Sequence, residues 1–145
     1  MIRRILVVCV GNICRSPMAE GLFRQALPQV QTSSAGMAAL VGHGADPTAV
    51  QIMAEAGADI TAHRARMLTD AIARDADLIL VMDDQQKQDI ATQYPYTRGK
   101  VFRLAEATKQ DIPDPYRQAP EVFRTVYSMI ENGVNDWVKR INGIG

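Results

Sequence analysis

The chain has 145 residues, a length typical of one domain with a single hydrophobic core. Lysine plus arginine and aspartate plus glutamate each number 16, so the formal net charge is zero, and no whole-chain field attracts nucleic acid or an anionic membrane. No apolar run approaches the roughly 20 residues of a transmembrane helix. We therefore expect one domain spanning residues 1–145, located in the cytoplasm, with no stable membrane insertion and no nucleic-acid partner.

Four apolar runs predict strands at about residues 4–10, 30–35, 78–82 and 100–104. Their continuous apolar character suits a parallel sheet that is covered on both faces. The intervening stretches predict helices at about residues 16–27, 47–56, 69–74 and 84–94. One long final helix follows, with an apolar face formed by Val122, Val126, Met129, Ile130, Gly133, Trp137 and Ile141. This alternation predicts an α/β fold, a three-layer sandwich in which helices flank a four-stranded parallel sheet.

The first predicted strand ends in CVGNICRSP, residues 9–17, where a Ser-Pro pair begins a helix. A loop between a strand and a helix N-terminus directs successive N–H groups into a concavity that binds anions. Gly11 permits close approach of the backbone, Asn12 tolerates a left-handed conformation, and the guanidinium of Arg15 matches two phosphate oxygens. The predicted phosphate-binding residues are Val10, Gly11, Asn12, Ile13, Cys14 and Arg15.

Cys9 lies at the base of this predicted loop. The helix dipole, the inward N–H groups and Arg15 all favour the thiolate over the thiol, which would place an activated nucleophile beneath a bound oxyanion. Ser16 is expected to donate its hydroxyl to the thiolate, to cap the helix, or to do both.

Phosphoryl transfer through a thiolate needs a proton donor for the leaving oxygen. Asp114 lies between Pro113 and Pro115, which stiffen its loop, and Tyr116 offers an aromatic wall beside it. Alone, this tetrapeptide is typical of a surface turn. Together with a nucleophile elsewhere in the chain, it makes Asp114 the candidate general acid.

Three other interpretations of the cysteine loop stay open. Cys9 could be a small buried hydrophobe at a strand end, with Arg15 in solvent. A zinc site would need ligands beyond Cys9 and Cys14, and the two histidines, His43 and His63, lie in different loops. A non-catalytic oxyanion-binding or thiol-redox module would use a reversible disulfide between Cys9 and Cys14.

The order C-x5-R-S near the N-terminus, followed late in the chain by D-P-Y, resembles the low molecular weight protein tyrosine phosphatases, and the resemblance covers nearly the whole chain. Several segments resemble the bacterial branch whose members partner tyrosine autokinases in capsule or exopolysaccharide export. These segments are SAG at 34–36, ALVGHGADPTA at 39–49, HRAR at 63–66, LILVMD at 78–83 and IPDPYR at 112–117.

The resemblance implies the fold of this family and a hydrolysis of phosphotyrosine that needs no cofactor and no metal. By motif, Cys9 would be the nucleophile, Arg15 the phosphate clamp, and Asp114 first the general acid and then the base that activates water. The implied intermediate is a cysteinyl-phosphate on Cys9.

The family also has a polar network that holds the loop in shape and a rim that contacts the substrate. The matching network positions are Asn12, Ser16, Ser34 and His63. The rim positions are Leu40 and Tyr116, whereas eukaryotic relatives carry an aromatic side chain in the loop that contains Leu40. This departure from the eukaryotic pattern predicts a more open cleft with less aromatic surface.

Two relatives on the same fold carry out other reactions. Arsenate reductases pass oxidation to further cysteines, and this chain has none after Cys14. Protein-arginine phosphatases carry threonine where this loop has Ile13, and the branched apolar side chain favours phosphotyrosine. The implied partner is a phosphotyrosine protein, namely a bacterial-type tyrosine autokinase.

Overall fold

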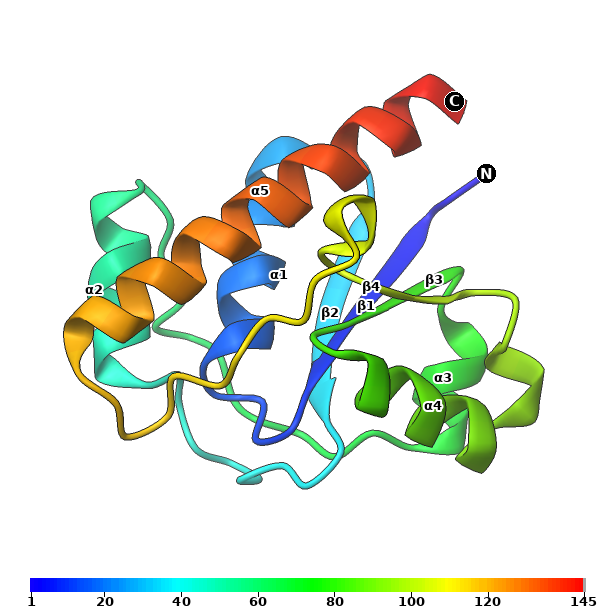
Figure 1. Ribbon diagram of the computed structural model, residues 1–145, viewed down its shortest axis with the longest axis horizontal. Helices are drawn as coiled ribbons and strands as arrows, with labels where there is room; N and C mark the ends of the chain where they lie inside the picture. Colours follow the sequence, from blue (N-terminus) through cyan, green and yellow to red (C-terminus); the bar gives the residue numbers. More distant parts are fainter. Residues whose placement is uncertain (145) are drawn as a thin grey trace.

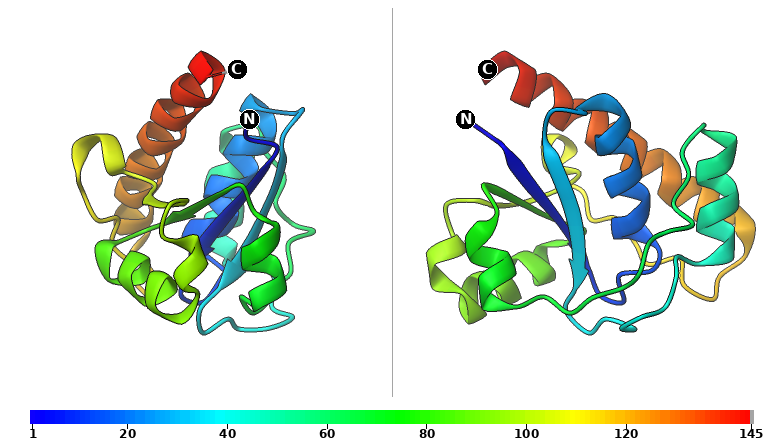
Figure 2. Two further views of the ribbon diagram at one scale, coloured as in Figure 1. Left: turned by 90° about the vertical axis from the view of Figure 1, so that its right-hand side faces the viewer. Right: turned by 180° about the vertical axis from the view of Figure 1, so that it is seen from behind.

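In the computed structural model, which describes residues 1–144, a parallel sheet lies between two layers of helices (Figure 1). The strands are β1 (Arg4–Cys9), β2 (Gln31–Gly36), β3 (Leu78–Val81) and β4 (Val101–Arg103), in the order β2-β1-β3-β4. One face is covered by α1 (Arg15–Ala26), α2 (Pro47–Glu55) and α5 (Pro120–Ile144), and the other by α3 (Asp70–Asp75) and α4 (Asp84–Gln93) (Figure 2). Two short 3-10 helices, η1 (Pro95–Thr97) and η2 (Glu106–Thr108), flank β4. The predicted three-layer α/β fold is confirmed.

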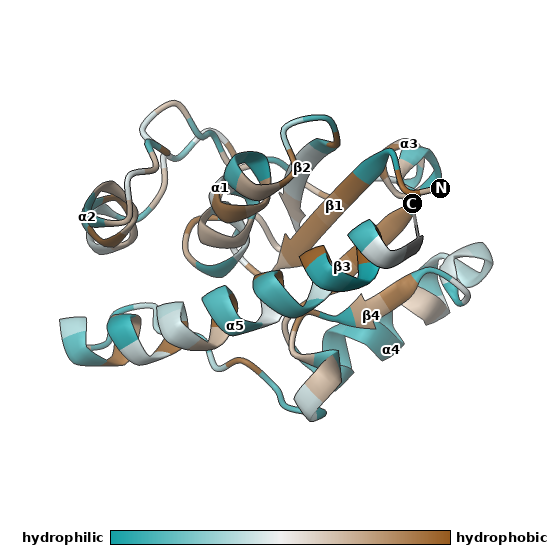
Figure 3. Cartoon of the chain, turned by 90° about the horizontal axis from the view of Figure 1, so that it is seen from above, coloured by the Kyte–Doolittle hydropathy of each residue, from teal (hydrophilic) through white to brown (hydrophobic). Residues whose placement is uncertain are grey.

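The two faces of β1 belong to two separate cores, which explains its continuous apolar sequence. Ile5 and Val7 pack in the core beneath α1 and α5, whereas Leu6 and Val8 pack in the core beneath α3 and α4. All four side chains are at most 1% exposed. Figure 3 shows β1 and β3 as apolar strands between more polar helices.

The predicted elements agree with the structure to within one residue at nearly every boundary, but the predicted cap of the first helix is wrong. The helix begins at Arg15, its N-cap residue is Cys14, and no side chain caps it. Ser16 is therefore already helical, and its hydroxyl is free for the contact described below. In the first turn of α5, the sequence pattern predicted that Val122 would be on the buried face, but Val122 is 36% exposed and Phe123 is 2% exposed.

The long helix α5 packs on the segment after β4 through a close backbone approach. A Cβ atom at Gly133 would lie 2.8 Å from the carbonyl oxygen of Leu104. One turn later, the indole N–H of Trp137 donates to the same oxygen at 3.0 Å. The glycine thus lets the helix come near enough for this hydrogen bond. No helix within residues 1–144 is long and apolar enough to cross a membrane.

The sheet order places the end of β1 at a topological switch point. From β1 the chain continues to β2 on one side, and β3 and β4 lie on the other side. Ligand crevices in open α/β sheets form at such points, outside the carboxyl ends of the strands. Cys9, the last residue of β1, lies there.

We expect Gly133→Ala to lower the free energy of unfolding by about 1–3 kcal/mol, because the new methyl group overlaps backbone and side-chain atoms of Leu104. The matched control is Gly143→Ala, also in α5, where a Cβ would have no neighbour within 4 Å and alanine gains helix propensity. Urea unfolding followed by circular dichroism measures both. Equal stability of the two variants would contradict the close packing of α5.

Candidate active site

The loop between β1 and α1 has its carbonyl groups bonded to the surrounding chain. The carbonyls of residues 9, 10, 11 and 13 accept N–H groups of Met37, Ala38, Leu40 and Asp46 at 2.8–3.0 Å. The carbonyl of Asn12 lies 2.6 Å from Nε2 of His63. In contrast, the N–H groups of residues 11–15 have no acceptor within the described part of the chain. They form a nest of donors at the N-terminus of α1, which is the predicted arrangement for binding an oxyanion.

Gly36 allows the loop and β2 to meet. It pairs with Cys9 across the sheet, and a Cβ atom there would lie 2.6 Å from the Val10 oxygen and 3.0 Å from the Asn12 Cβ. Any side chain would displace the loop backbone. This contact gives a physical reason for the glycine in the SAG segment.

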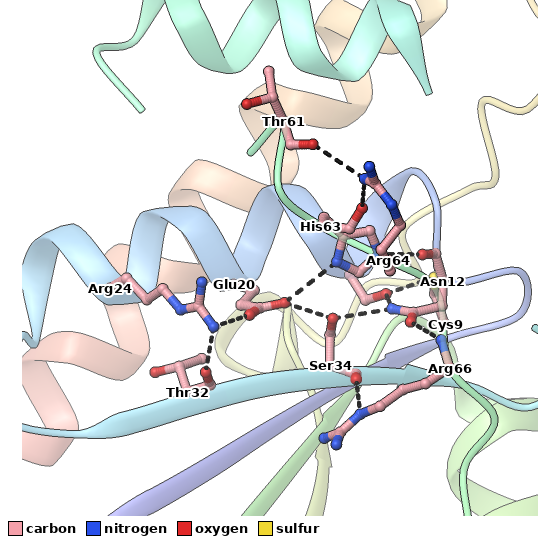
Figure 4. A network of polar contacts seen from close by, with 11 residues as sticks. Cys9, Asn12, Glu20, Arg24, Thr32, Ser34, Thr61, His63, Arg64 and Arg66 are labelled. Carbon is pink, nitrogen blue, oxygen red and sulfur yellow. Dashed lines mark hydrogen bonds and ion pairs between the residues drawn. The ribbon is translucent and has the colours of Figure 1, made fainter. Parts of the chain in front are cut away.

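Asn12 holds the loop in a left-handed backbone conformation, with φ of 59°. Its side chain is fully buried. The amide nitrogen donates to Ser16 Oγ at 2.8 Å. It also donates to Ser34 Oγ at 3.0 Å, and the amide oxygen accepts the Arg66 N–H at 2.9 Å (Figure 4). These contacts oppose the strain of the left-handed conformation.

Ser16 connects this network to the cysteine. Its Oγ lies 2.9 Å from Cys9 Sγ. Because the same oxygen accepts a hydrogen from Asn12, its own hydrogen is free to point at the sulfur. Of the two predicted roles of Ser16, the structure therefore has the contact with Cys9 and not the helix cap.

Glu20 completes the network, and sequence reasoning missed it. The carboxylate is buried in α1, accepts the Ser34 hydroxyl at 2.6 Å and pairs with Arg24 at 2.5 Å. His63 Nδ1 lies 3.9 Å away. The only sequence signal was the spacing of four residues to Arg24, which is equally typical of a solvent-exposed helical pair.

Arg15 and Asp114 meet above the loop although they are far apart in sequence. The guanidinium is 3% exposed, and its Nη1 donates to the Ile112 carbonyl at 2.8 Å. Its Nη2 lies 3.8 Å from Asp114 Oδ2. The buried Nε has no hydrogen-bond partner. A buried donor without a partner is costly, so an acceptor such as a bound oxyanion fits here.

The predicted nucleophile, clamp, acid and rim residues line one cavity of about 170 Å³, whereas the side chain of Asn12 lies in the supporting network and not in the cavity wall. Its walls are Cys9, Val10, Gly11, Ile13, Cys14, Arg15, Ala38, Leu40, Asp114 and Tyr116. Three apolar rim side chains are between 37% and 41% exposed, namely Val10, Leu40 and Tyr116. Asp114 accepts the Tyr116 N–H at 3.0 Å, which fixes its carboxylate on the rim. The structure thus brings together the predicted nucleophile, clamp, acid and rim.

The second cysteine differs from the first in its surroundings. Both cysteines are free thiols in the structure. Burial, followed by the negative charges of Asp46 and Cys9, raises the pKa of the Cys14 thiol far above its usual range. Cys14 therefore stays protonated at neutral pH, and its disulfide with Cys9 stays a prediction.

Within residues 1–144, no group of three or more His, Cys, Asp or Glu side chains is arranged to hold a metal ion. The imidazole of His63 is directed at the loop carbonyl of Asn12. His63 therefore contacts the phosphate-binding loop.

Comparison with known proteins decides the family. The model of the low molecular weight phosphotyrosine protein phosphatase family matches residues 4–143. The chain belongs to this family. The resemblance of the cysteine loop and the D-P-Y segment is thereby confirmed.

Three relatives illustrate the match. The chain is 54% identical over 145 residues to a probable low molecular weight protein-tyrosine-phosphatase EpsP of Ralstonia nicotianae, covering 100% of both. A structure of Vibrio vulnificus Wzb in complex with benzylphosphonate has a TM-score of 0.93 at 38% identity, covering 97% of this chain and 99% of that one. The arginine phosphatase YwlE from Geobacillus stearothermophilus has a TM-score of 0.90 at 33% identity, covering 97% and 93%. The fold alone therefore does not decide between tyrosine and arginine substrates.

Iodoacetamide at about pH 8, where an ordinary cysteine is partly ionised, should modify Cys9 and spare Cys14. The raised pKa of Cys14 keeps it in the unreactive thiol form. Peptide mass spectrometry after timed quenching measures the modification of each cysteine, and inorganic phosphate should protect Cys9. In urea both cysteines should react, which serves as the control. Comparable rates in the folded protein would contradict the assigned environment of Cys14.

Proposed function

We propose that the chain is a protein-tyrosine-phosphatase that hydrolyses phosphotyrosine through a cysteinyl-phosphate on Cys9. One observation carries the proposal: Cys9 lies in a pocket where the loop N–H groups and the buried Nε of Arg15 lack acceptors, and Asp114 lines the same pocket. The family match supports the same reaction.

In the first step, the Cys9 thiolate attacks the phosphorus atom in line with the tyrosyl oxygen. The S–P bond forms, the P–O bond to tyrosine breaks, and Asp114 gives its proton to the leaving phenolate oxygen. Arg15 and the loop N–H groups stabilise the negative charge on the three remaining phosphoryl oxygens. The hydroxyl of Ser16 lies 2.9 Å from Cys9 Sγ and stabilises the thiolate when the second step releases it.

In the second step, water attacks the phosphorus atom of the cysteinyl-phosphate. Asp114, now a carboxylate, takes a proton from this water, and the S–P bond breaks to release inorganic phosphate and the Cys9 thiolate. Asp114 is thereby protonated again for the next cycle. Its side chain is 49% exposed, so it can also exchange protons with solvent.

The substrate class follows from the walls of the pocket. Ile13, Leu40 and Tyr116 provide apolar surface that suits a phenyl ring better than a charged guanidinium. An arginine phosphatase is the second candidate, because YwlE shares the fold. The apolar Ile13 in the loop favours phosphotyrosine over phosphoarginine.

We further infer that the physiological substrate is a phosphotyrosine protein, a bacterial-type tyrosine autokinase that controls capsule or exopolysaccharide production. The support is the resemblance of the whole chain to the bacterial branch, together with its identity to EpsP. This role requires the phosphatase to be in the cytoplasm, where ATP-dependent phosphorylation takes place. Loss of phosphotyrosine from the isolated kinase domain on incubation with the native protein tests the partner.

Replacing the nucleophile tests the chemistry. The native protein should release phosphate from phosphotyrosine in the presence of EDTA and reductant, and phosphoarginine should be a poorer substrate. Cys9→Ser should lose turnover but still bind vanadate, because a serine hydroxyl is far less ionised than a thiol. Undiminished hydrolysis by the variant would exclude Cys9 as the nucleophile, and preference for phosphoarginine would support the second candidate.

Replacing the acid tests the role of Asp114. Asp114→Asn should slow hydrolysis of phenyl phosphate by about 100-fold or more, since general acid catalysis contributes at least that much. Hydrolysis of p-nitrophenyl phosphate should fall much less, because its leaving group needs little protonation. Asp89→Asn, which removes an exposed carboxylate on α4, is the matched control. An equal loss for both substrates would argue against Asp114 as the acid.

A further inference from the structure

The outer edge of β2 has an unusual pattern of hydrogen bonds. β2 is an edge strand, so one side of its backbone has no neighbouring strand, apart from a bridge between its last residue, Gly36, and Met67. The carbonyl of Thr32 accepts Arg24 Nη2 at 3.2 Å, and the carbonyl of Ser34 accepts Arg66 Nε at 2.8 Å (Figure 4). Arginine side chains thus already occupy the outward carbonyls of Thr32 and Ser34, and the Leu68 N–H occupies that of Gly36 at 2.9 Å.

Two outward donors of the same edge are free, whereas the N–H of Gly36 donates to the Arg66 carbonyl at 2.9 Å. The N–H groups of Thr32 and Ser34 have no acceptor among the residues that the structure describes. The side chain of Thr32 adds a second observation, because the residue is 6% exposed and its buried Oγ1 has no hydrogen-bond partner. Because the edge carbonyls are occupied, the free backbone groups of the edge are donors, and the Thr32 hydroxyl can donate as well. A group that only accepts hydrogen bonds therefore complements this edge.

Two adjoining grooves run along this edge, of about 1140 Å³ and 530 Å³, and Arg24, Ser33 and Arg66 line both. The larger groove is also lined by Arg4 and Arg74, and the smaller one by Arg64.

The cations of these grooves differ in their partners. Arg4, Arg24 and Arg74 each pair with a carboxylate. Arg64 and Arg66 bond only to carbonyl oxygens and form no ion pair within residues 1–144. Their guanidiniums keep donors and charge available for a ligand.

We propose that the outer edge of β2 is a docking surface for an extended acidic segment of a partner protein. Carboxylates of such a segment would accept hydrogen bonds from Arg66, Arg64 and the free N–H groups of β2. Outward groups two residues apart on a strand are about 6.6 Å apart, the same spacing as alternate side chains of an extended peptide. A neutral strand fits poorly, because its own N–H groups would find the edge carbonyls occupied.

This surface is separate from the catalytic pocket, with which its grooves share no lining residue. The surface adjoins the network that supports the phosphate-binding loop, because the backbone N–H of Arg66 donates to Asn12 Oδ1. A partner bound in this way would place its acidic segment along the outer edge of β2 and its phosphotyrosine in the catalytic pocket. The proposal does not depend on the catalytic mechanism.

Fluorescence anisotropy with a labelled decaglutamate peptide tests the surface, with decaglutamine as the neutral probe and saturating vanadate in the catalytic loop. Decaglutamate should bind and decaglutamine should not, and raising the ionic strength to about 0.5 M should weaken binding through screening. Arg64→Gln with Arg66→Gln should weaken binding by about fivefold or more, as expected for two lost charge pairs.

The matched control is Arg98→Gln with Lys139→Gln, which removes the same charge away from the grooves. Arg66→Lys, which keeps the charge, should retain most of the binding, and thermal melting confirms that each variant is folded. No binding, equal losses in the control, or displacement by vanadate would overturn the proposal. Tighter binding of a dT10 oligonucleotide that depends on the same arginines would also overturn it, in favour of a nucleic-acid surface.

Discussion

The site depends on a single residue in a left-handed backbone conformation, Asn12. That conformation costs roughly 1–2 kcal/mol for a residue with a side chain, and glycine would adopt it without this cost. Asparagine is suited to the position because its buried amide makes three hydrogen bonds, two of them to the hydroxyls of Ser16 and Ser34. Around this residue the loop carbonyls accept hydrogen bonds from the surrounding chain, whereas the loop N–H groups have no acceptor among the described residues and are free to bind an anion. The three bonds of the Asn12 amide stabilise this conformation of the loop.

The carboxylate of Glu20 determines which groups of this network donate hydrogen bonds and which accept them. The carboxylate of Glu20, paired with Arg24, can only accept a hydrogen bond, so the Ser34 hydroxyl must donate to it. Ser34 therefore accepts from Asn12, whose second amide hydrogen goes to Ser16. A charge on α1 thus orders a chain of neutral groups, and such fully satisfied networks are rigid.

The sequence was sufficient for the parts of the site that follow local rules. The apolar run before Cys9, the glycine and asparagine of the loop, and the prolines around Asp114 each have a local physical meaning, and the structure has them in those places. Glu20 could not be found in this way, because its burial depends on how α1 lies against β2. The Ser16 cap was wrong for a related reason: the helix starts one residue earlier, and tertiary contacts take the hydroxyl.

The backbone around Ile112 positions both Arg15 and Asp114. The Ile112 carbonyl accepts Arg15, and the Ile112 N–H donates to the Met82 carbonyl at the end of β3. The side chain of Gln86, in α4, accepts the Met82 N–H at 3.0 Å. The loop that carries Asp114 is thus connected through Met82 to helix α4. The Nη1 of the Arg15 guanidinium is thus hydrogen-bonded to the Ile112 carbonyl, while its buried Nε has no partner. Because that desolvation cost is already paid on folding, a phosphoryl oxygen that supplies the missing acceptor gains more than it would from an arginine in solvent.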